Sequence, residues 1–344
     1  MSKLAICTFA TKGYLFVFPQ MIRRVSAAIS HLEGGDFIFS TDKSNESKDA
    51  VKVIESEMPP NWNIHTIQHD MPDDTSENYK LEAQIRIAKL QGSAFAAARK
   101  LKSDLCWCIE SDVLVPPDAF KLSEWVLNMP DHYYDIAMVT YPNSGFLGGR
   151  GTYQHPIAQD FLMEERVVPE RLKKRVEAHD DAYKKFVTKQ RPIPERWGKI
   201  KEKLHKLVSE CPPDGNVFTV NGKYGWRRRG WFENAYPGIG RGSIVPTDWL
   251  GLGCTLLSKR ALELATFEGY QGVGTQDLFL CWSRWNPHEL NMACIPHVLC
   301  DHVKPERDEK GKRTGKIVHM KAWHEPEGEC VGHLRTATVP WINL

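Results

Sequence analysis

Residues 104–117 read DLCWCIESDVLVPP: an apolar run, an acidic turn, a second apolar run and two prolines. The residues from Leu105 to Ile109 predict a buried strand, and the turn Glu110-Ser111-Asp112 follows it directly. Two carboxylates at the end of a buried strand offer the hard oxygen ligands that Mg²⁺ or Mn²⁺ prefers. Taken alone, the tripeptide is more typical of a solvated acidic turn, so a metal-binding function depends on the segments around it.

Strand-like and helix-like segments alternate on both sides of this stretch. Residues 4–9 (LAICTF), 36–40 (DFIFS) and 135–141 (DIAMVTY) have the apolar character of strands. A helical stretch, 19–32, separates the first two, and apolar or small residues spaced by four and three across 81–101 predict a helix with one buried face. This alternation predicts an α/β fold, in which helices flank a mostly parallel central sheet.

Composition excludes several classes of protein. The 344 residues are 42% hydrophobic and 26% charged, which is typical of globular chains and not of fibrous, low-complexity or disordered ones. No apolar run approaches the roughly 20 residues of a membrane span. Nine cysteines occur without a CxxC pair and without a recognisable signal peptide. They predict reduced thiols in a cytoplasmic protein, with Cys106 and Cys108 on one face of their strand.

The charge of the chain is unevenly distributed. The formal total is +2, but residues 151–230 carry a net charge of +7, which leaves −5 on the rest. The basic segment contains the run WRRRGW at 226–231. Its side chains Arg227, Arg228 and Arg229 would contact phosphates if the segment binds nucleic acid, where the tryptophans would stack on bases. Alternatively, the segment consists of solvated helices, and these arginines order an acceptor loop or bind a diphosphate.

A second group of functional candidates lies between residues 246 and 285. Asp248 and Trp249 precede Gly251 and Gly253, where the backbone can approach a ligand closely because no Cβ intervenes. Further on, Asp277 falls in the first turn of a predicted helix. An acid there either complements the helix dipole or acts as a general base.

The third candidate is a histidine after an apolar run. Residues 291–304 (NMACIPHVLCDHVK) predict one strand that ends at Asp301-His302. A histidine at a strand end is either a satisfied structural residue or a nitrogen ligand for a metal. Alternation along a single strand would place His297 and His302 on opposite faces, so at most one of them would reach the site.

The order of these elements resembles that of the GT-A glycosyltransferases, and in particular the polypeptide N-acetylgalactosaminyltransferases and related family 2-like enzymes. In that family an acidic metal motif is followed by a glycine-containing loop, a helix start that carries the base, and a C-terminal metal-binding histidine. The matching residues are Glu110-Ser111-Asp112, Gly251-Leu252-Gly253, Thr275-Gln276-Asp277 and His302. The metal motif departs from the family in beginning with Glu, and the base motif in reading Thr-Gln-Asp.

The resemblance implies a GT-A, Rossmann-like nucleotide-sugar-binding fold with a helical or loop insertion. By this division, 1–148 form the nucleotide-sugar-binding half, 149–245 a basic insertion that would bind the acceptor, 246–304 the catalytic half, and 305–344 a tail. The implied activity is metal-dependent transfer of a sugar, with inversion, from a nucleoside diphosphate sugar such as a UDP-sugar to a hydroxyl. The acceptor would be a glycan, a protein or a hydroxymethylated pyrimidine in DNA.

The resemblance also assigns roles to individual residues. Asp112, His302 and Glu110 would bind Mn²⁺ or Mg²⁺, and Asp277 would be the catalytic base. The donor would contact Thr8, Ala10, Asp42, Lys80, Arg86, Ser111, Gly251 and Gly253. The donor sugar or the acceptor would contact Asp248, Trp249, Gln276 and Trp285.

Two other functions fit parts of the sequence. One is a non-catalytic GT-A-like module that binds a nucleotide sugar or a nucleic acid, although such a module needs no base. The other is a zinc hydrolase built from His297, His302, His319 and His324, for which the HExxH or CxxC spacing is missing.

Overall fold

The structure is a computed structural model of the 344-residue chain. It describes residues 2–71, 81–130, 133–143, 155–156, 158–159, 170, 174, 215–220, 223–228, 244–247, 249–272, 275–307 and 313–320. The helices expected between 151 and 230 lie outside these residues, apart from two single positions. In the part of the chain that is described, no helix is both long and apolar enough to cross a membrane.

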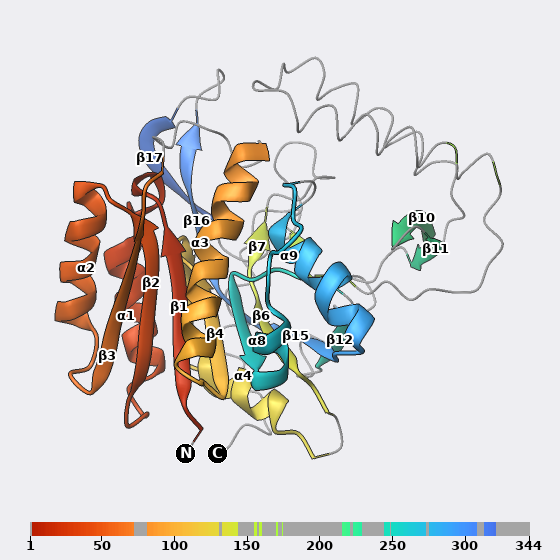
Figure 1. The fold of residues 1–344 in the computed structure, drawn as a ribbon, viewed down its shortest axis with the longest axis horizontal. Helices are drawn as coiled ribbons and strands as arrows, with labels where there is room; N and C mark the ends of the chain where they lie inside the picture. The colour runs from red at the N-terminus through yellow and green to blue at the C-terminus, as the bar shows by residue number, and fades with distance from the viewer. Residues whose placement is uncertain are drawn as a thin grey trace, which may run out of the picture.

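An eight-stranded sheet forms the centre of the molecule, with the strand order β12-β15-β6-β14-β4-β1-β2-β3 (Figure 1). Its strands are β1 (Leu4–Ala10), β2 (Gly35–Asp42), β3 (Trp62–His69), β4 (Leu105–Glu110), β6 (Ile136–Thr140), β12 (Val245–Thr247), β14 (Cys254–Ser258) and β15 (Met292–Leu299). All run in one direction except β14 and β12, which pair antiparallel with their neighbours. The expected α/β fold, with a mostly parallel central sheet, is therefore confirmed.

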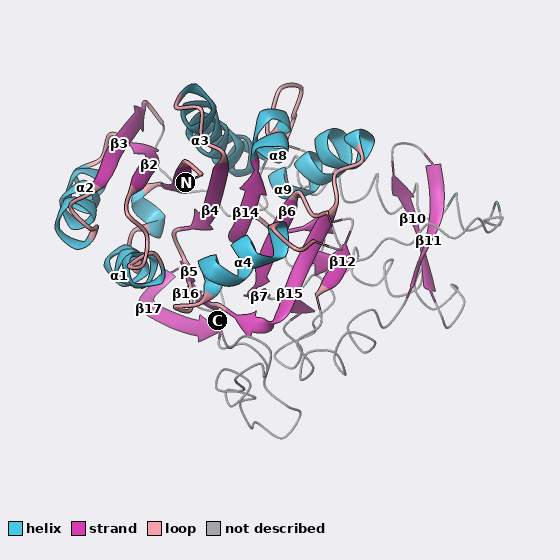
Figure 2. Ribbon diagram, turned by 90° about the horizontal axis from the view of Figure 1, so that it is seen from below, coloured by secondary structure: helices cyan, strands magenta, loops and turns pink. Residues whose placement is uncertain are grey.

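Helices cover both faces of this sheet (Figure 2). One face carries α1 (Phe18–Ala28), α2 (Asn45–Glu57) and α4 (Ala119–Leu127), and the other carries α3 (Leu81–Lys100), α8 (Lys259–Leu264) and α9 (Gln276–Leu280). Local chemistry sets several of the helix starts. Ser44 and Ser258 cap α2 and α8, because each hydroxyl accepts a hydrogen bond from the backbone N–H three residues on. The long α3 agrees with the helix expected over 81–101.

A group of buried cysteines lies under α3. The Cys7 thiol donates to the Ala94 carbonyl at 3.6 Å, the Cys106 thiol donates to Cys7 at 3.4 Å, and the Gln91 amide donates to Cys108. Cys106 and Cys108 thus share a face of β4, as their spacing predicts. Burial raises the pKa of Cys7 and Cys108 well above the ordinary thiol value. These thiols are core residues and not reactive ones.

The strand predicted across 291–304 is in fact two strands, which corrects the sequence analysis. β15 leaves the main sheet at Leu299, after a register shift against β6. After Cys300 the chain enters β16 (Asp301–Arg307), which lies between β5 (Val113–Leu114) and β17 (Arg313–Met320) in a second, three-stranded sheet. The alternation argument for positions 297 and 302 therefore does not apply. The boundary expected at 304 falls inside β16, because backbone pairing with β17 continues the strand past it.

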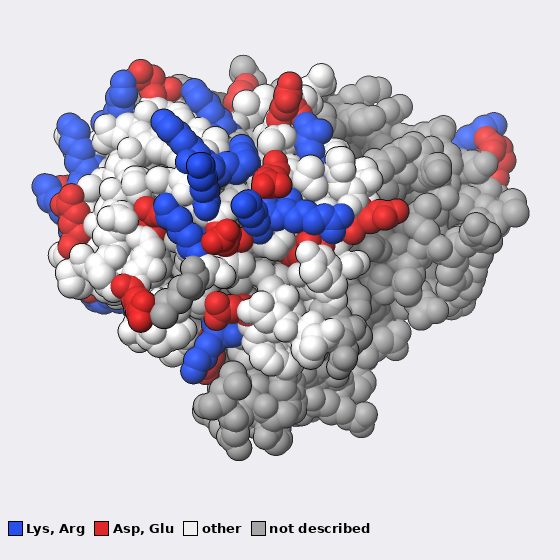
Figure 3. Space-filling model, turned by 60° about the horizontal axis from the view of Figure 1, so that its bottom comes forward, with Lys and Arg blue, Asp and Glu red and all other residues white. Residues whose placement is uncertain are grey.

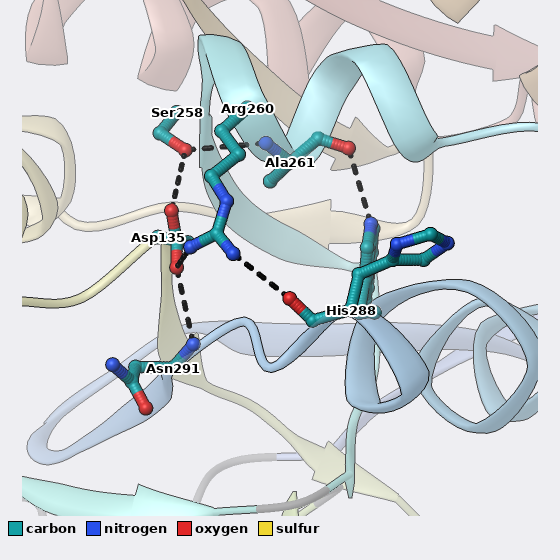
Figure 4. Close-up of polar contacts among 7 residues, drawn as sticks. Asp135, Ser258, Arg260, Ala261, His288 and Asn291 are labelled. Atoms are coloured by element: carbon teal, nitrogen blue, oxygen red, sulfur yellow. Dashed lines mark hydrogen bonds and ion pairs between the residues drawn. The ribbon is translucent and has the colours of Figure 1, made fainter.

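Two buried aspartates join elements at the amino end of the sheet. Asp135, just before β6, is fully buried and accepts hydrogen bonds from Arg260 at 3.2 Å, the Ser258 hydroxyl at 3.5 Å and the Asn291 N–H at 3.1 Å (Figure 4). Arg260 also donates to the His288 carbonyl. These bonds connect β6, the start of α8 and the loop before β15.

The second buried aspartate is Asp36 in β2, which pairs with Lys3 at 3.4 Å and with His65 at 2.8 Å. Around this end, the surface carries basic and acidic side chains in close alternation (Figure 3). The exposed bases Lys259 and Arg260 share α8 with the exposed acid Glu263, and exposed Lys3 pairs with Asp36. The described residues of this face are thus of mixed sign and do not form a continuous basic patch like those that bind nucleic acid.

Candidate functional site

The acidic turn and His302 come together at the opposite, carboxyl end of the sheet. Ligand atoms of Glu110, Asp112 and His302 all lie within 4.8 Å of one another. The Asp112 carboxylate lies 3.3 Å from Nε2 of His302. Asp112 and His302 are buried, at 6% and 1% exposure, and Glu110 is half-buried.

Backbone pairing explains how residues so distant in sequence meet. Val113 pairs with His302 in the small sheet, and the Val303 N–H donates to the Asp112 carbonyl at 2.8 Å. The strand after the acidic turn therefore holds the histidine beside the turn. Two carboxylates and an imidazole form a donor set that fits a divalent cation, whose charge would offset the repulsion between buried acids.

Tyr141, which sequence reasoning did not single out, lies at the centre of this region. It directly follows β6 and is 1% exposed. The ring of Tyr141 meets the His302 ring edge to face, with centroids 5.4 Å apart and an interplanar angle of 82°. Burial, together with the carboxylates of Glu110, Asp277 and Asp112, raises the pKa of Tyr141 well above its ordinary value. One phenol therefore faces the charges of both acidic motifs.

The glycine loop packs against this tyrosine. A Cβ on Gly253 would lie 2.4 Å from Cζ of Tyr141, so only glycine fits here. The Gly253 N–H donates to the Tyr141 hydroxyl at 3.1 Å, and the Gly253 carbonyl accepts from the Glu110 N–H at 3.0 Å. A ligand was expected to approach the backbone at Gly253, but the side chain of Tyr141 occupies that position. Gly251 is also engaged, because its carbonyl accepts from the Thr255 hydroxyl.

Asp277 lies in the first turn of α9, as expected. It is 7% exposed and accepts a hydrogen bond from the Leu278 N–H at 2.8 Å. Burial raises the pKa of its carboxyl group above the ordinary aspartate value, against the opposing effect of that backbone bond. A raised pKa is what a general base near neutral pH requires. Gln276 beside it is buried as well.

The residues expected to meet the nucleobase form a separate part of the same edge. Asp42 ends β2 and accepts from the Lys12 and Ser44 backbone N–H groups and the Ser47 hydroxyl, at 2.7 to 3.0 Å. Burial alone would raise the pKa of Asp42, but these hydrogen bonds outweigh it and lower the pKa. Asp42 thereby joins the loop after β1 to the start of α2. Thr8 and Ala10 are buried in β1.

Other expected site residues have different placements. Trp285 is fully buried and donates its indole N–H to the Ala261 carbonyl at 3.1 Å, so it packs in the core and does not offer a face to a sugar. Ser111 is buried within the acidic turn, and Arg86 is half-buried on α3.

Several predicted contacts lie outside the described residues. These are Lys80, Asp248 and Arg229, together with the side chains of Trp249 on β13 (Trp249–Leu250) and of Arg227 and Arg228 on β11 (Lys223–Arg228), which pairs with β10 (Gly215–Val220).

Comparison with known proteins finds no matching family model and no matching curated protein. Solved structures are similar at a low level. A CMP:2-keto-3-deoxy-manno-octonic acid synthetase complexed with CTP is 10% identical over 87% of this chain and 90% of that one, with a TM-score of 0.36. S. aureus TarS 1-349 is 11% identical over 46% of this chain and 41% of that one, with a TM-score of 0.31.

A third similar structure is glucosyl-3-phosphoglycerate synthase from Mycobacterium tuberculosis, solved with Mn²⁺, UDP-glucose and glycerol 3-phosphate. It is 13% identical over 41% of this chain and 44% of that one, with a TM-score of 0.26. The chain thus spans less than half the length of two of these three proteins. Because every TM-score is below 0.5, the function is inferred from the chain's own residues.

Proposed function

We propose that the protein is a metal-dependent glycosyltransferase that moves a sugar from a nucleoside diphosphate sugar to an acceptor hydroxyl. The observation that carries this proposal is the grouping of Glu110, Asp112 and His302 at the carboxyl end of the central strands, where open α/β sheets bind their ligands. Asp277 is near enough for its charge to contribute to the raised pKa of Tyr141 beside this group.

Glu110, Asp112 and His302 would hold the divalent ion, either Mn²⁺ or Mg²⁺. When bound, such an ion supplies positive charge that favours departure of the diphosphate. The acidic turn positions the two carboxylates, and the pairing of β16 with β5 brings the imidazole to them.

Asp277 would accept the proton of the acceptor hydroxyl. As that proton moves to the carboxylate, the acceptor oxygen forms a bond to the anomeric carbon, and the bond from this carbon to the diphosphate oxygen breaks. Attack opposite to the leaving group inverts the anomeric configuration. The raised pKa of Asp277 supports this role, because proton transfer is most effective when the pKa of the base is near the working pH.

A donor screen followed by a turnover assay tests the proposal. One of a panel of nucleoside diphosphate sugars should raise the melting temperature when Mn²⁺ is present, since a ligand specific for the native state stabilises it. With that donor, release of the nucleoside diphosphate should depend on Asp112 and Asp277. Asp112→Asn and Asp277→Asn should abolish it, whereas the exposed Asp49→Asn should not.

Other outcomes would point to other functions. Donor protection without turnover, under any acceptor tested, would indicate the non-catalytic binding module. Release of pyrophosphate from a nucleoside triphosphate and a free sugar would indicate nucleotidyl transfer. Product of retained configuration would contradict the role of Asp277 as the inverting base.

The acceptor requires a separate test of the basic segment. If the acceptor is a hydroxymethylated pyrimidine in DNA, the protein should retard duplex DNA in a gel at low salt, and replacing Arg227, Arg228 and Arg229 by Ala should remove the shift. Retardation that persists in this triple variant would exclude the arginine run as the contact.

A further inference from the structure

We propose that Tyr141 is a positioning residue for the metal-binding group, orienting His302 through its ring and Glu110 through the glycine loop. This inference rests on the proposed function, since it takes Glu110, Asp112 and His302 as metal ligands. It adds a residue that contacts His302 directly and Glu110 through Gly253, without being a ligand itself.

The first contact is between two rings. Pairing of β16 with β5 fixes the backbone of His302, but it does not fix the rotation of the imidazole, whose terminal torsion has a broad minimum. The edge-to-face contact with Tyr141, at 5.4 Å and 82°, lies within the preferred geometry of such ring pairs. Both side chains are almost fully buried, so the tyrosine ring limits the rotation that the backbone leaves open.

The second contact runs through Gly253. The pairing of β14 with β4 ends at Cys254 and Ile109, one residue short of Glu110. Beyond that point, the Glu110 N–H donates to the Gly253 carbonyl, while the Gly253 N–H donates to the Tyr141 hydroxyl. The Tyr141 hydroxyl therefore holds Gly253 in place, and Gly253 in turn holds the backbone of Glu110. An alanine at 253 would overlap the tyrosine ring, so the two positions are matched in shape.

The Tyr141 side chain thus contacts the proposed ligand His302 and also Gly253, the residue that holds the backbone of the proposed ligand Glu110. Residues that orient metal ligands from outside the ligand set typically contribute 10- to 100-fold in metal affinity. We therefore expect removal of the tyrosine ring to weaken metal binding even though no ligand atom is lost.

The test is Mn²⁺ binding to the full chain without nucleotide, followed by the electron paramagnetic resonance signal of free Mn²⁺. Tyr141→Leu removes both contacts and should weaken Mn²⁺ binding by about tenfold or more. Phe39→Leu is the matched control, because Phe39 is also a fully buried ring, but it packs on Phe18 of α1. It should lower stability and leave Mn²⁺ affinity unchanged.

A second variant separates the two contacts and does not depend on the folding of Tyr141→Leu. Tyr141→Phe keeps the ring and loses the hydroxyl. Its Mn²⁺ affinity should stay closer to wild type than that of Tyr141→Leu, while the Gly253 amide should exchange with deuterium faster because its acceptor is gone.

Each contrary result has a distinct meaning. Equal Mn²⁺ affinity in Tyr141→Leu and wild type would overturn the inference and leave the proposed function standing. The same would follow from an unchanged Gly253 exchange rate in Tyr141→Phe, or from a loss of Mn²⁺ affinity in Phe39→Leu as large as that in Tyr141→Leu. If wild type binds no Mn²⁺, the inference and the metal dependence of the proposed function fail together.

Discussion

Buried carboxylates lie at both ends of the central sheet, and their partners differ. At the amino end, Asp135 pairs with Arg260, and Asp36 pairs with Lys3 as well as His65, so each acid has a lysine or arginine side chain beside it. At the carboxyl end, Asp112 pairs with His302, whose charge depends on protonation, and Glu110 belongs to the same group. Asp277 forms no ion pair with any described residue, and its pKa is raised. Burial of an acid is therefore common to both ends, and the absence of a lysine or arginine partner among the described residues distinguishes the acids of the proposed site.

The largest expected difference between the two ends is in activity. Asp112→Asn should lower kcat/KM by more than about 100-fold, because loss of a metal ligand exceeds the usual effect of losing a residue that orients one. Donor turnover with Mn²⁺ measures this effect. Metal-free stability should not fall, since the change removes the negative charge of a buried acid that has a second, half-buried acid beside it. A large loss of stability would show that Asp112 is a structural residue like Asp135.

The same Asp→Asn change at the amino end should lower the stability of the fold and leave Mn²⁺ binding unchanged. Asp135→Asn weakens three hydrogen bonds, one of them to Arg260, and should lower the free energy of unfolding by about 2 kcal/mol. The figure is moderate because Arg260 is about half exposed and its charge is screened by solvent. Urea denaturation checks the loss, and Mn²⁺ affinity should stay at the wild-type value. Weakened Mn²⁺ binding would mean that the two ends are coupled.

The carboxyl group of Asp277 should make the stability of the protein depend on pH. Its folded pKa is raised, so as pH rises from the ordinary aspartate value through the folded pKa, the unfolded chain ionises first and the native state loses stability. Asp277→Asn removes this loss. The metal-free variant should therefore be more stable than wild type at neutral pH, and the difference should vanish once the pH falls below the ordinary aspartate value. Thermal melts across that range measure it; a difference of the opposite sign would show that the carboxylate is stabilised by its surroundings.

The smallest effect is expected at an exposed ion pair. Arg23 of α1 pairs with Glu57 of α2 at 2.9 Å, with the arginine largely exposed. Glu57→Gln should change the free energy of unfolding by less than about 1 kcal/mol, as is usual for surface pairs. Denaturation at low and high salt provides the check. A larger loss of unfolding free energy would show that an exposed ion pair on the surface can contribute as much to stability as the buried pairs at the ends of the sheet.

Sequence patterns predicted the fold well because they are local. The apolar run before Glu110 and the helical spacing over 81–101 each specify an element within one stretch of chain, and the acidic helix start at Asp277 is confirmed in the same way. Tyr141 has no such pattern. Its position depends on β6 lying beside β14 in the sheet, which sequence spacing does not determine.

Three expectations failed for similar reasons. The break at Cys300 lies inside a continuous apolar stretch, and only pairing with β5 reveals that a new strand begins there. The glycine at 253 correctly predicted that another group approaches the backbone closely, but the missing Cβ does not show whether that group is a ligand or a tyrosine side chain. The core position of Trp285 was missed for the same reason, since a tryptophan is compatible with both a sugar-binding surface and a packed interior.

The pairing of β16 with β5 has a consequence for the order in which the molecule is assembled. All eight strands of the central sheet are complete by Leu299, whereas the histidine proposed as a metal ligand follows at 302. A chain with its whole central sheet in place therefore still lacks one of the proposed metal ligands until β16 has paired with β5. Metal capture becomes possible only when a late segment returns to dock beside the acidic turn. Metal uptake would then report that the last-made part of this region has reached its native place.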